Sequence, residues 1–251
     1  MTLVAVTSVN LSATIRALGH CMQHASFGAV KLLTDSVPYG LPENAQWEPI
    51  EPLRSSRAYS DFILQKLAAH VATSHCLLVQ WDGHLINPEH WRPEFLDYDY
   101  IGASWPQFGD GHDVGNGGFS LRSRALLEAC QDPQFLRSHP EDLAICRHNR
   151  ALLEGCGMRF APRHLADLFS AERVGDPSCS FGYHGVWHMP STIGMDAFWE
   201  IYVGLDDRST VQHDFVQLLW QMASSGRGAG RSFRMIRDRV LDAVARRRIE
   251  R

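Results

Sequence analysis

Apolar residues along the first part of the chain follow two spacings, and these spacings predict strands that alternate with helices. Short apolar runs typical of buried strands lie at Leu3–Val9, Ala29–Leu33 and Cys76–Gln80. Between them, apolar residues recur every three or four positions within Ala13–His24 and Ser56–Ala72, as in amphipathic helices. Alternation of this kind indicates a mainly parallel sheet.

The same spacings continue through the rest of the chain. Further strands are predicted at Tyr98–Ala103 and Phe119–Arg122, and further helices at Ser123–Gln131, Glu141–Leu153, Asp206–Met222 and Phe233–Arg248. A flexible Ser- and Gly-rich segment, residues 224–230, separates the last two helices. We therefore expect an α/β fold with a mainly parallel sheet flanked by helices, in a single domain over residues 1–205. A helical, basic extension over residues 206–251 follows it.

Composition narrows the class of protein. With 251 residues, of which 45% are hydrophobic and 21% charged, the sequence is that of a globular protein with one substantial core. Six cysteines without a CxxC spacing are typical of reduced thiols rather than of a disulfide framework or a zinc knuckle. No apolar run has the length of a membrane span, and the first strand begins without a basic leader. A cytoplasmic location is the expectation.

Positive charge is concentrated at the C-terminal end. From Ser225 onward, nine arginines face three acidic residues, a net charge of +6 that leaves −10 for the rest of a chain whose total is −4. Phe233, Ile236, Val240 and Val244 recur there at helical spacing. Such a segment either docks on an inner-membrane surface or packs on the acidic body of the protein. Without aromatic residues interleaved among the arginines, it does not resemble a nucleic-acid-binding segment.

A carboxylate and an imidazole directly follow the predicted strand that ends at Gln80, in the sequence Trp81-Asp82-Gly83-His84. Ligands of open α/β sheets bind at the carboxyl ends of the strands. Carboxylate and imidazole groups, together with phosphate oxygens, bind Mn²⁺ or Mg²⁺, and such a cation neutralises a diphosphate leaving group. The alternative is a turn in which Asp82 binds backbone amides and His84 is exposed.

A glycine-rich segment, Gly115-Asn116-Gly117-Gly118, is the second candidate site. It lacks the lysine of a phosphate-binding loop, and its glycines indicate a close approach to the backbone. A sugar can lie there against Gly117 and Gly118, with Trp105 as a stacking face and Asn116 as a hydrogen-bonding group. A β-bulge or a hairpin without a ligand is the alternative.

Acidic and histidine residues complete the set of candidates. Glu141 and Asp142 begin a predicted helix, where they are either the general base for an acceptor hydroxyl or caps of the helix. Further along, two histidines four residues apart lie among aromatic residues and glycines. His184, or in second place His188, is our candidate for a late metal ligand, and the alternative is a structural histidine.

These segments together resemble an uncharacterised bacterial family that is regarded as glycosyltransferase-like, the domain of unknown function 5672. The resemblance rests on the runs Gln80–Gly83, Tyr98–Trp105, Gly115–Ser123 and Glu141–Asp142. More distantly, the order of these motifs is similar to that of GT-A glycosyltransferases, whose α/β nucleotide-binding domain carries a metal-binding Asp-x-Asp at a strand end. The resemblance implies a GT-A-like, Rossmann-like fold and a nucleoside diphosphate sugar donor, with a UDP-sugar as the first choice.

The resemblance also implies metal ligands. The third position of the triplet is His84 here, as in the polypeptide N-acetylgalactosaminyltransferases, which bind Mn²⁺ through Asp-x-His and a later histidine. By that likeness, Asp82, His84 and His184 are the metal ligands.

Roles for other residues follow from further likenesses. In β-1,4-galactosyltransferase-like enzymes a Gly-Gly segment precedes a Glu-Asp pair whose acids face the acceptor. Gly117 and Gly118 followed by Glu141 and Asp142 are similar to this arrangement, at a longer separation. Thr7, at the end of the first strand, corresponds to the position near the nucleotide base.

The function expected from the sequence is transfer of a sugar from a nucleoside diphosphate donor to a glycan or lipid-linked acceptor in bacterial surface polysaccharide biosynthesis. The transfer would depend on Mn²⁺ or Mg²⁺. With Asp142 as base, direct displacement inverts the anomeric carbon, whereas a retaining route is favoured if no acid reaches the acceptor. Two alternatives are a catalytically inactive carbohydrate- or nucleotide-binding module and a metal-dependent phosphoester hydrolase, for which paired acidic ligands are expected.

Overall fold

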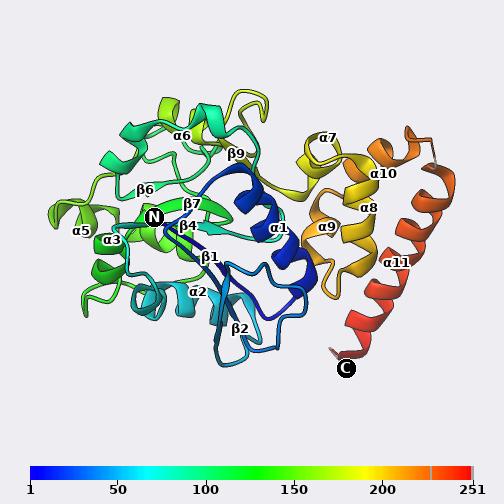
Figure 1. Cartoon of the computed structure of the whole chain (residues 1–251), viewed down its shortest axis with the longest axis horizontal. Coiled ribbons are helices and arrows are strands. Elements are labelled where there is room, and N and C mark those ends of the chain that lie inside the picture. Colours follow the sequence, from blue (N-terminus) through cyan, green and yellow to red (C-terminus); the bar gives the residue numbers. More distant parts are fainter. Residues whose placement is uncertain (227, 250–251) are drawn as a thin grey trace. The chain divides into compact units, whose positions relative to one another are not determined.

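The computed structural model describes residues 1–226 and 228–249, and these residues form two compact units (Figure 1). The first unit covers Met1–Gly185 and the second Val186–Arg251. The division therefore falls earlier than the expected one at residue 205. The reason is that helix α8 (Met195–Gly204) bonds to the C-terminal helix, through Arg231 to Asp196 and Tyr202 to Asp238.

A six-stranded sheet forms the centre of the first unit. Its strands, in the order β3-β2-β1-β4-β7-β6, are β3 (Gln46–Pro49), β2 (Ala29–Thr34), β1 (Thr2–Val6), β4 (His75–Val79), β7 (Phe119–Ser123) and β6 (Tyr100–Ile101). The first four are mutually parallel, β7 runs antiparallel to β4, and β6 antiparallel to β7. The predicted α/β fold with a mainly parallel sheet flanked by helices is confirmed.

The central strands are buried on both faces, which explains why they appear in the sequence as continuous apolar runs. Alternate residues of β1 enter different clusters, because successive side chains of a strand point to opposite faces. Leu3 packs in the cluster that contains Leu18 of α1 (Leu11–His24), and Val4 packs with Phe62 of α2 (Ser56–Gln65). The helices thus cover both faces of the sheet and hold the strand ends in place.

Three predicted helices are interrupted in the structure, the third of them, expected over Asp206–Met222, being divided into α9 (Ser209–His213) and α10 (Phe215–Ala223). The one expected over Ser56–Ala72 ends with α2, and a 3₁₀ turn, Leu67–His70, follows. The one expected over Glu141–Leu153 is divided into α4 (Glu141–Leu143), a π-helical turn (Ala144–His148) and α5 (Arg150–Gly155). Asn149 accounts for the second interruption, because its backbone N–H donates to the carbonyl of Ala144 while its side chain bonds the backbone of Leu136.

A second, small sheet lies beside the first and was not expected from the sequence. It has the order β5-β9-β8, with β5 (Gly83–Leu85), β9 (Gly182–His184) and β8 (Ser170–Ala171). β5 and β9 are antiparallel, and Gly83 pairs with His184 while His84 pairs with Tyr183. The segment predicted to be a loop at the end of β4 therefore enters a strand after only three residues.

The remaining elements of the first unit are short. They are α3 (Arg124–Ala129), α6 (Arg163–Phe169) and the 3₁₀ turns Pro88–His90 and Pro93–Asp97.

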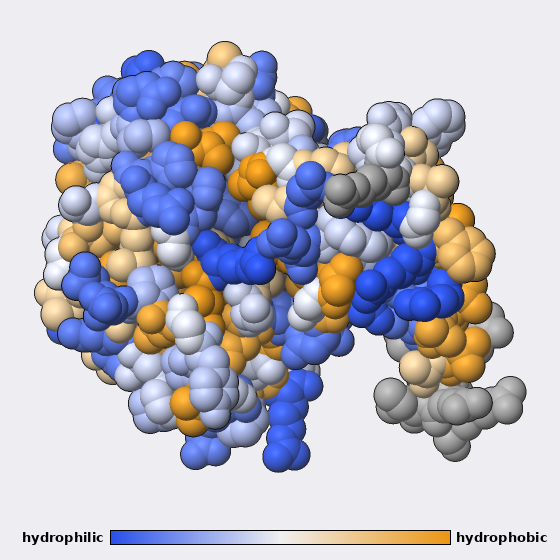
Figure 2. Space-filling model, turned by 45° about the vertical axis from the view of Figure 1, so that its right-hand side comes forward, coloured by the Kyte–Doolittle hydropathy of each residue, from blue (hydrophilic) through white to orange (hydrophobic). Residues whose placement is uncertain are grey.

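The second unit is helical. It begins with the 3₁₀ turn Val186–His188 and continues with α7 (Met189–Thr192), α8, α9 (Ser209–His213), α10 (Phe215–Ala223) and α11 (Gly228–Ile249). Helix α11 begins before the expected Phe233 and takes in the last three residues of the expected linker; Arg227 of that linker lies outside the described residues. No helix of the described chain combines the length and the apolar character needed to cross a bilayer. Figure 2 shows apolar and hydrophilic side chains intermingled over one face.

Candidate functional site

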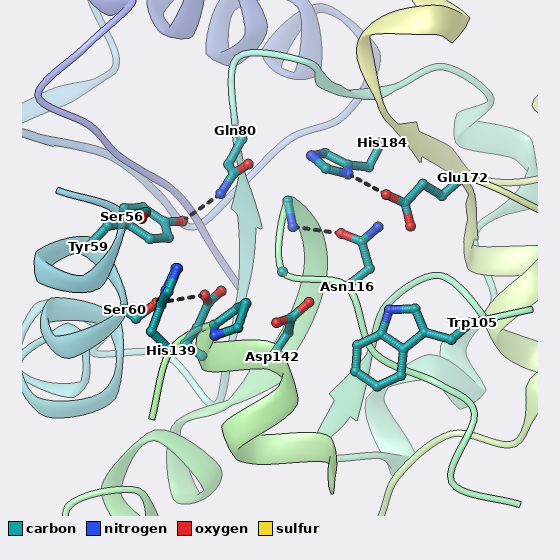
Figure 3. Close-up of a pocket in the computed structure, with 14 residues that line it drawn as sticks. Ser56, Tyr59, Ser60, Gln80, Trp105, Asn116, His139, Asp142, Glu172 and His184 are labelled. Carbon is teal, nitrogen blue, oxygen red and sulfur yellow. Dashed lines mark hydrogen bonds and ion pairs between the residues drawn. The ribbon is translucent and has the colours of Figure 1, made fainter. Parts of the chain in front are cut away.

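A cavity of about 290 Å³ opens at the carboxyl end of β4, between α2, α4 and the glycine-rich segment before β7 (Figure 3). All of its lining residues belong to the first unit. They are Ser56, Tyr59, Ser60, Gln80, Trp105, Asn116, Gly117, Gly118, His139, Pro140, Glu141, Asp142, Glu172 and His184. The cavity thus gathers seven residues that the sequence singled out: Trp105, Asn116, Gly117, Gly118, Glu141, Asp142 and His184.

His184 lines one side of this cavity, and its ring contacts Asp82, which is not itself among the lining residues. The Nε2 atom of His184 lies 3.4 Å from Oδ1 of Asp82, and the Asp82 side chain is almost completely buried. Within the described part of the chain, neither Asp82 oxygen nor His184 Nε2 has a hydrogen-bond partner of good geometry. Buried polar atoms are nearly always satisfied, so two atoms that meet only in a 3.4 Å ion pair, beside Asp82 Oδ2 without a hydrogen bond among the described residues, indicate a place for a ligand.

Glu172 fixes the orientation of the His184 ring. Its Oε1 lies 3.2 Å from Nδ1 of His184, as Figure 3 shows, so Nε2 is directed away from Glu172. Burial alone would lower the pKa of His184, but the Asp82 carboxylate and then Glu172 outweigh it and raise the pKa to about 10. A carboxylate behind a histidine is also the usual arrangement around a metal-binding imidazole.

His84 lies on the other face of the β5–β9 ladder. Because it pairs with Tyr183 rather than with His184, its ring points toward α1, where its Nδ1 lies 2.7 Å from the Tyr183 hydroxyl. The ring of His20 stands edge-on to it, with 5.2 Å between the centroids. Burial, and then His20, lower the pKa of His84 to about 3.

The expected trio of metal ligands is therefore not assembled in this structure. Asp82 and His184 lie together, while His84 faces away, because residues 83 and 84 form a strand whose successive side chains alternate. Among the described residues, no group of three His, Cys, Asp or Glu side chains is placed to hold a metal ion. Of the three candidates, only Asp82 and His184 lie together, with His184 lining the cavity.

The glycines of the glycine-rich segment make room for protein side chains. A Cβ on Gly118 would lie 2.0 Å from His184 Nε2, and one on Gly117 would lie 2.2 Å from Oε1 of Glu141. Asn116 has a left-handed backbone (φ 63°), and its Oδ1 accepts a hydrogen bond from the Gly118 N–H at 3.0 Å. The segment thus brings His184 and Glu141 close to the backbone at the cavity wall.

Glu141 is bound in a buried ion pair. Its Oε1 accepts a hydrogen bond from Nη2 of Arg122 at 3.1 Å, and its Oε2 accepts one from the Ser60 hydroxyl at 3.4 Å. Arg122 is fully buried on β7, and its guanidinium also lies over the Tyr100 ring. A carboxylate held in this way is suited to fix the site rather than to take up a proton.

Asp142 differs from its neighbour. Figure 3 shows its carboxylate directed into the cavity. One oxygen accepts the N–H of Leu143 at 2.8 Å, and no arginine bonds it in the described residues. Burial, and then the charge of Glu141, raise the pKa of Asp142 to about 6. Of the two acids, Asp142 therefore has the properties of a general base that works near neutral pH.

Polar residues that the sequence did not single out form the opposite wall. The Gln80 amide donates to the Tyr59 hydroxyl at 3.1 Å, and the Ser60 hydroxyl lies 2.8 Å from Nδ1 of His139. The sequence signal for a buried polar group here is Arg122, a charged residue within an apolar strand. Glu172 carried no such signal, since only the folding of β8 and β9 brings it to His184.

The other candidates lie as follows. Trp105 lines the cavity, but its ring packs against Gly115 and Phe108, which leaves its edge rather than its face for a ligand. Thr7 follows β1 at the same edge of the sheet, bonds the backbone of Val9 and is not among the lining residues. His188 belongs to the second unit, where its carbonyl accepts the Thr192 hydroxyl.

Several solved structures share a general similarity with the chain. The apo form of the glycosyltransferase GlyE from Streptococcus pneumoniae is 12% identical with a TM-score of 0.46, over 86% of this chain and 63% of that one. A glycosyltransferase involved in glycosylation of the major capsid of PBCV-1 is 12% identical with a TM-score of 0.45. The similarity covers 73% of this chain and 92% of that one. Bifunctional IspDF from Campylobacter jejuni is 10% identical with a TM-score of 0.41. The similarity covers 64% of this chain and 48% of that one, so the chain spans about half the length of that protein.

Sequence comparison identifies the family. No curated protein sequence matches the chain. The model of the family described as protein of unknown function (DUF5672) matches residues 45–184, which include Asp82, the glycine-rich segment, Asp142 and His184. Because this match covers 140 of the 251 residues, the chain belongs to the DUF5672 family.

Proposed function

We propose that this protein is a glycosyltransferase that moves a sugar from a nucleoside diphosphate donor to an acceptor hydroxyl, with a divalent cation bound at Asp82 and His184. The observation that carries the proposal is the buried pair of Asp82 and His184, whose imidazole lines the cavity, together with the carboxylate of Asp142, which has a raised pKa and lines the same cavity. The first group is suited to a cation and its phosphate ligands, and the second to proton removal.

The donor set fits Mn²⁺ or Mg²⁺. One carboxylate and one imidazole oriented by Glu172 are acceptable ligands of either ion, and His84 is not required for them. When bound, such a cation supplies positive charge to a departing diphosphate. Asp82 and His184 would hold it, and Glu172 would keep the His184 ring in position through its Nδ1.

Asp142 acts as the base in this proposal. It takes the proton of the acceptor hydroxyl, whose oxygen forms a bond to the anomeric carbon as the bond from that carbon to the diphosphate breaks. A single displacement of this kind inverts the anomeric carbon. Burial, and then the neighbouring Glu141 carboxylate, which is paired with Arg122, raise the pKa of Asp142 to about 6.

The remaining assignments concern substrate binding. We propose a UDP-sugar as donor, with Thr7 near the nucleotide base at the edge of the sheet. A glycan or lipid-linked acceptor would lie between Asn116, Gly117, Gly118 and the edge of Trp105. Cytoplasmic synthesis of a bacterial surface polysaccharide is the setting we propose for such a transferase.

Thermal unfolding with nucleotides tests the proposal. We expect one nucleoside diphosphate to raise the Tm only together with Mn²⁺ or Mg²⁺, because a ligand that binds the native state alone stabilises it. The nearly isosteric Asp82→Asn should lose this shift, whereas His84→Gln, on the other face of the same strand, should keep it. Equal shifts in all three proteins would contradict the assignment of Asp82.

Turnover then separates the proposal from its alternatives. Release of the nucleoside diphosphate from the matching nucleotide sugar, dependent on an added glycan acceptor, is the expected result. Binding without turnover would identify a binding module, and release of phosphate from simple esters would identify a hydrolase.

A further inference from the structure

Helix α11 in the second unit has an inner face that is occupied by contacts within that unit. Met235 is completely buried, and Asp238 is buried and accepts the Tyr202 hydroxyl of α8 at 3.4 Å. One helical turn further, Asp242 forms two hydrogen bonds with Arg208. These positions, spaced by three and four residues, define the side of α11 that packs on the other helices of the unit.

The opposite side of α11 carries an apolar stripe in solvent. Phe233, Val240 and Val244 are spaced by seven and four residues, and their exposed fractions are 71%, 57% and 46%. Ile236 and Leu241, also exposed, border them on either side. Large apolar side chains that gather on one helix face without a cover mark an interaction surface.

Charge identifies the kind of partner. Both acidic residues of α11, Asp238 and Asp242, lie on its inner face and are bonded there. Arg237, whose side chain is half exposed, follows Ile236 at the border of the stripe and also bonds Asp238, whereas the guanidinium of Arg239 lies over the Phe215 ring of α10. Downstream the sequence continues with Arg246, Arg247 and Arg248. Apolar and hydrophilic side chains also lie side by side toward the right of Figure 2, where Figure 1 places α11.

We propose that the outer face of α11 docks on an anionic lipid surface. Apolar side chains on one helix face, flanked by cationic ones, suit a helix that lies in the membrane interface. Arginines near an anionic leaflet are attracted by its negative surface potential. A second copy of the chain is a poorer partner, because a two-fold contact would set the same arginine-flanked stripe against itself without an acidic residue to pair with.

Co-sedimentation of the full-length protein with vesicles tests this proposal without any substrate, so its outcome is independent of the proposed transferase activity. We expect binding to vesicles of phosphatidylcholine with about a third phosphatidylglycerol, weaker binding to phosphatidylcholine alone, and weaker binding in high salt. The double variant Phe233→Ser/Val240→Ser should bind anionic vesicles at least about tenfold more weakly, since it loses two apolar anchors. Tyr39→Ser, at another highly exposed residue, should bind like the unaltered protein.

Three results would overturn the proposal. They are no preference for anionic vesicles, unchanged binding by the double variant, or a stable dimer in sedimentation that the double variant abolishes. Circular dichroism of the double variant should match that of the unaltered protein, because both substituted side chains are largely exposed. A variant with altered secondary structure would be replaced by Phe233→Gln alone, for which weakened binding is again expected and unchanged binding is again the contrary result.

Discussion

The two faces of the β5–β9 ladder carry histidines with opposite properties, His84 being buried and His184 largely buried. His184 and His84 lie on adjacent rungs, yet the pKa of His184 is raised to about 10 and that of His84 is lowered to about 3. Two carboxylates, Asp82 and Glu172, adjoin His184, whereas the neighbours of His84 are the ring of His20 and the hydroxyl of Tyr183.

This difference shows that the neighbours of a buried histidine, rather than its burial or its place in a motif, decide what it can do. Desolvation acts on both residues in the same direction. On the cavity side, carboxylates compensate it and leave unsatisfied polar atoms for a ligand. On the α1 side, the imidazole is neutral and packed, as in an ordinary core. The cavity side is therefore expected to carry function and the α1 side to carry stability.

The largest effect is expected for Asp142→Asn on the cavity side. Loss of the base should lower turnover by about 10²–10⁴-fold, while the metal-dependent Tm shift with nucleotide is kept. In the unaltered protein, the rate should rise with pH through about 6, because Asp142 must lose its proton to act as base. A variant with near-normal turnover and the same pH profile would exclude Asp142 as the base.

The buried ion pair below the cavity should have the next largest effect, this time on stability. Arg122→Met leaves the Glu141 carboxylate buried with only the distant Ser60 hydroxyl, which we expect to cost about 3–5 kcal/mol of unfolding free energy. Adding Glu141→Gln to it removes the stranded charge and should recover part of the loss. Urea unfolding of the singles and the double measures this coupling, and strictly additive losses would show that the pair does not act as a unit.

A single methyl group tests the close approach of His184. Gly118→Ala would place its Cβ 2.0 Å from Nε2 of His184, so the ring must shift from its position beside Asp82 and Glu172. We expect a loss of about 1–3 kcal/mol of stability together with loss of the metal-dependent nucleotide shift. Gly109→Ala is the matched control, since a Cβ there meets nothing within 4 Å. Equal behaviour of the two variants would argue against this crowding.

The smallest effect, on the pH dependence of stability, is expected on the α1 side of the β5–β9 ladder. Burial lowers the folded-state pKa of His84 to about 3 and that of His20 to about 4, below the 6.5 of an unfolded histidine. Between pH 6.5 and about 4 the unfolded chain therefore binds more protons, and stability falls as pH falls, by at most about 1.4 kcal/mol per pH unit for each histidine. His84→Gln should make this dependence shallower in denaturant titrations at several pH values. An unchanged slope would show that His84 does not contribute to it.

Much of the fold followed from local patterns. The spacing of apolar residues predicted β1, α1, β2, β4 and β7 nearly to their ends, because strands and helices buried in an α/β core need those periods. It also placed Asp82 at a strand end and singled out Gly118 and Asp142, which line the cavity, because glycines and acidic residues at the ends of elements can be recognised in the sequence. The helix interruptions at Lys66 and Asn149 could not be predicted from the sequence pattern, because they depend on side-chain hydrogen bonds and packing.

The sequence by itself determined the kinds of chemical group available and the sheet edge at which they emerge. Only the tertiary structure decided which of them meet. The pairing of β5 with β9, about a hundred residues apart, sets His184 toward Asp82 and turns His84 away. The antiparallel strand β7 places Arg122 below the cavity, where it binds Glu141. Asp142 is not bound by Arg122, and its carboxylate lines the cavity. Strand register and long-range contacts depend on the whole folded chain, and no short motif contains them.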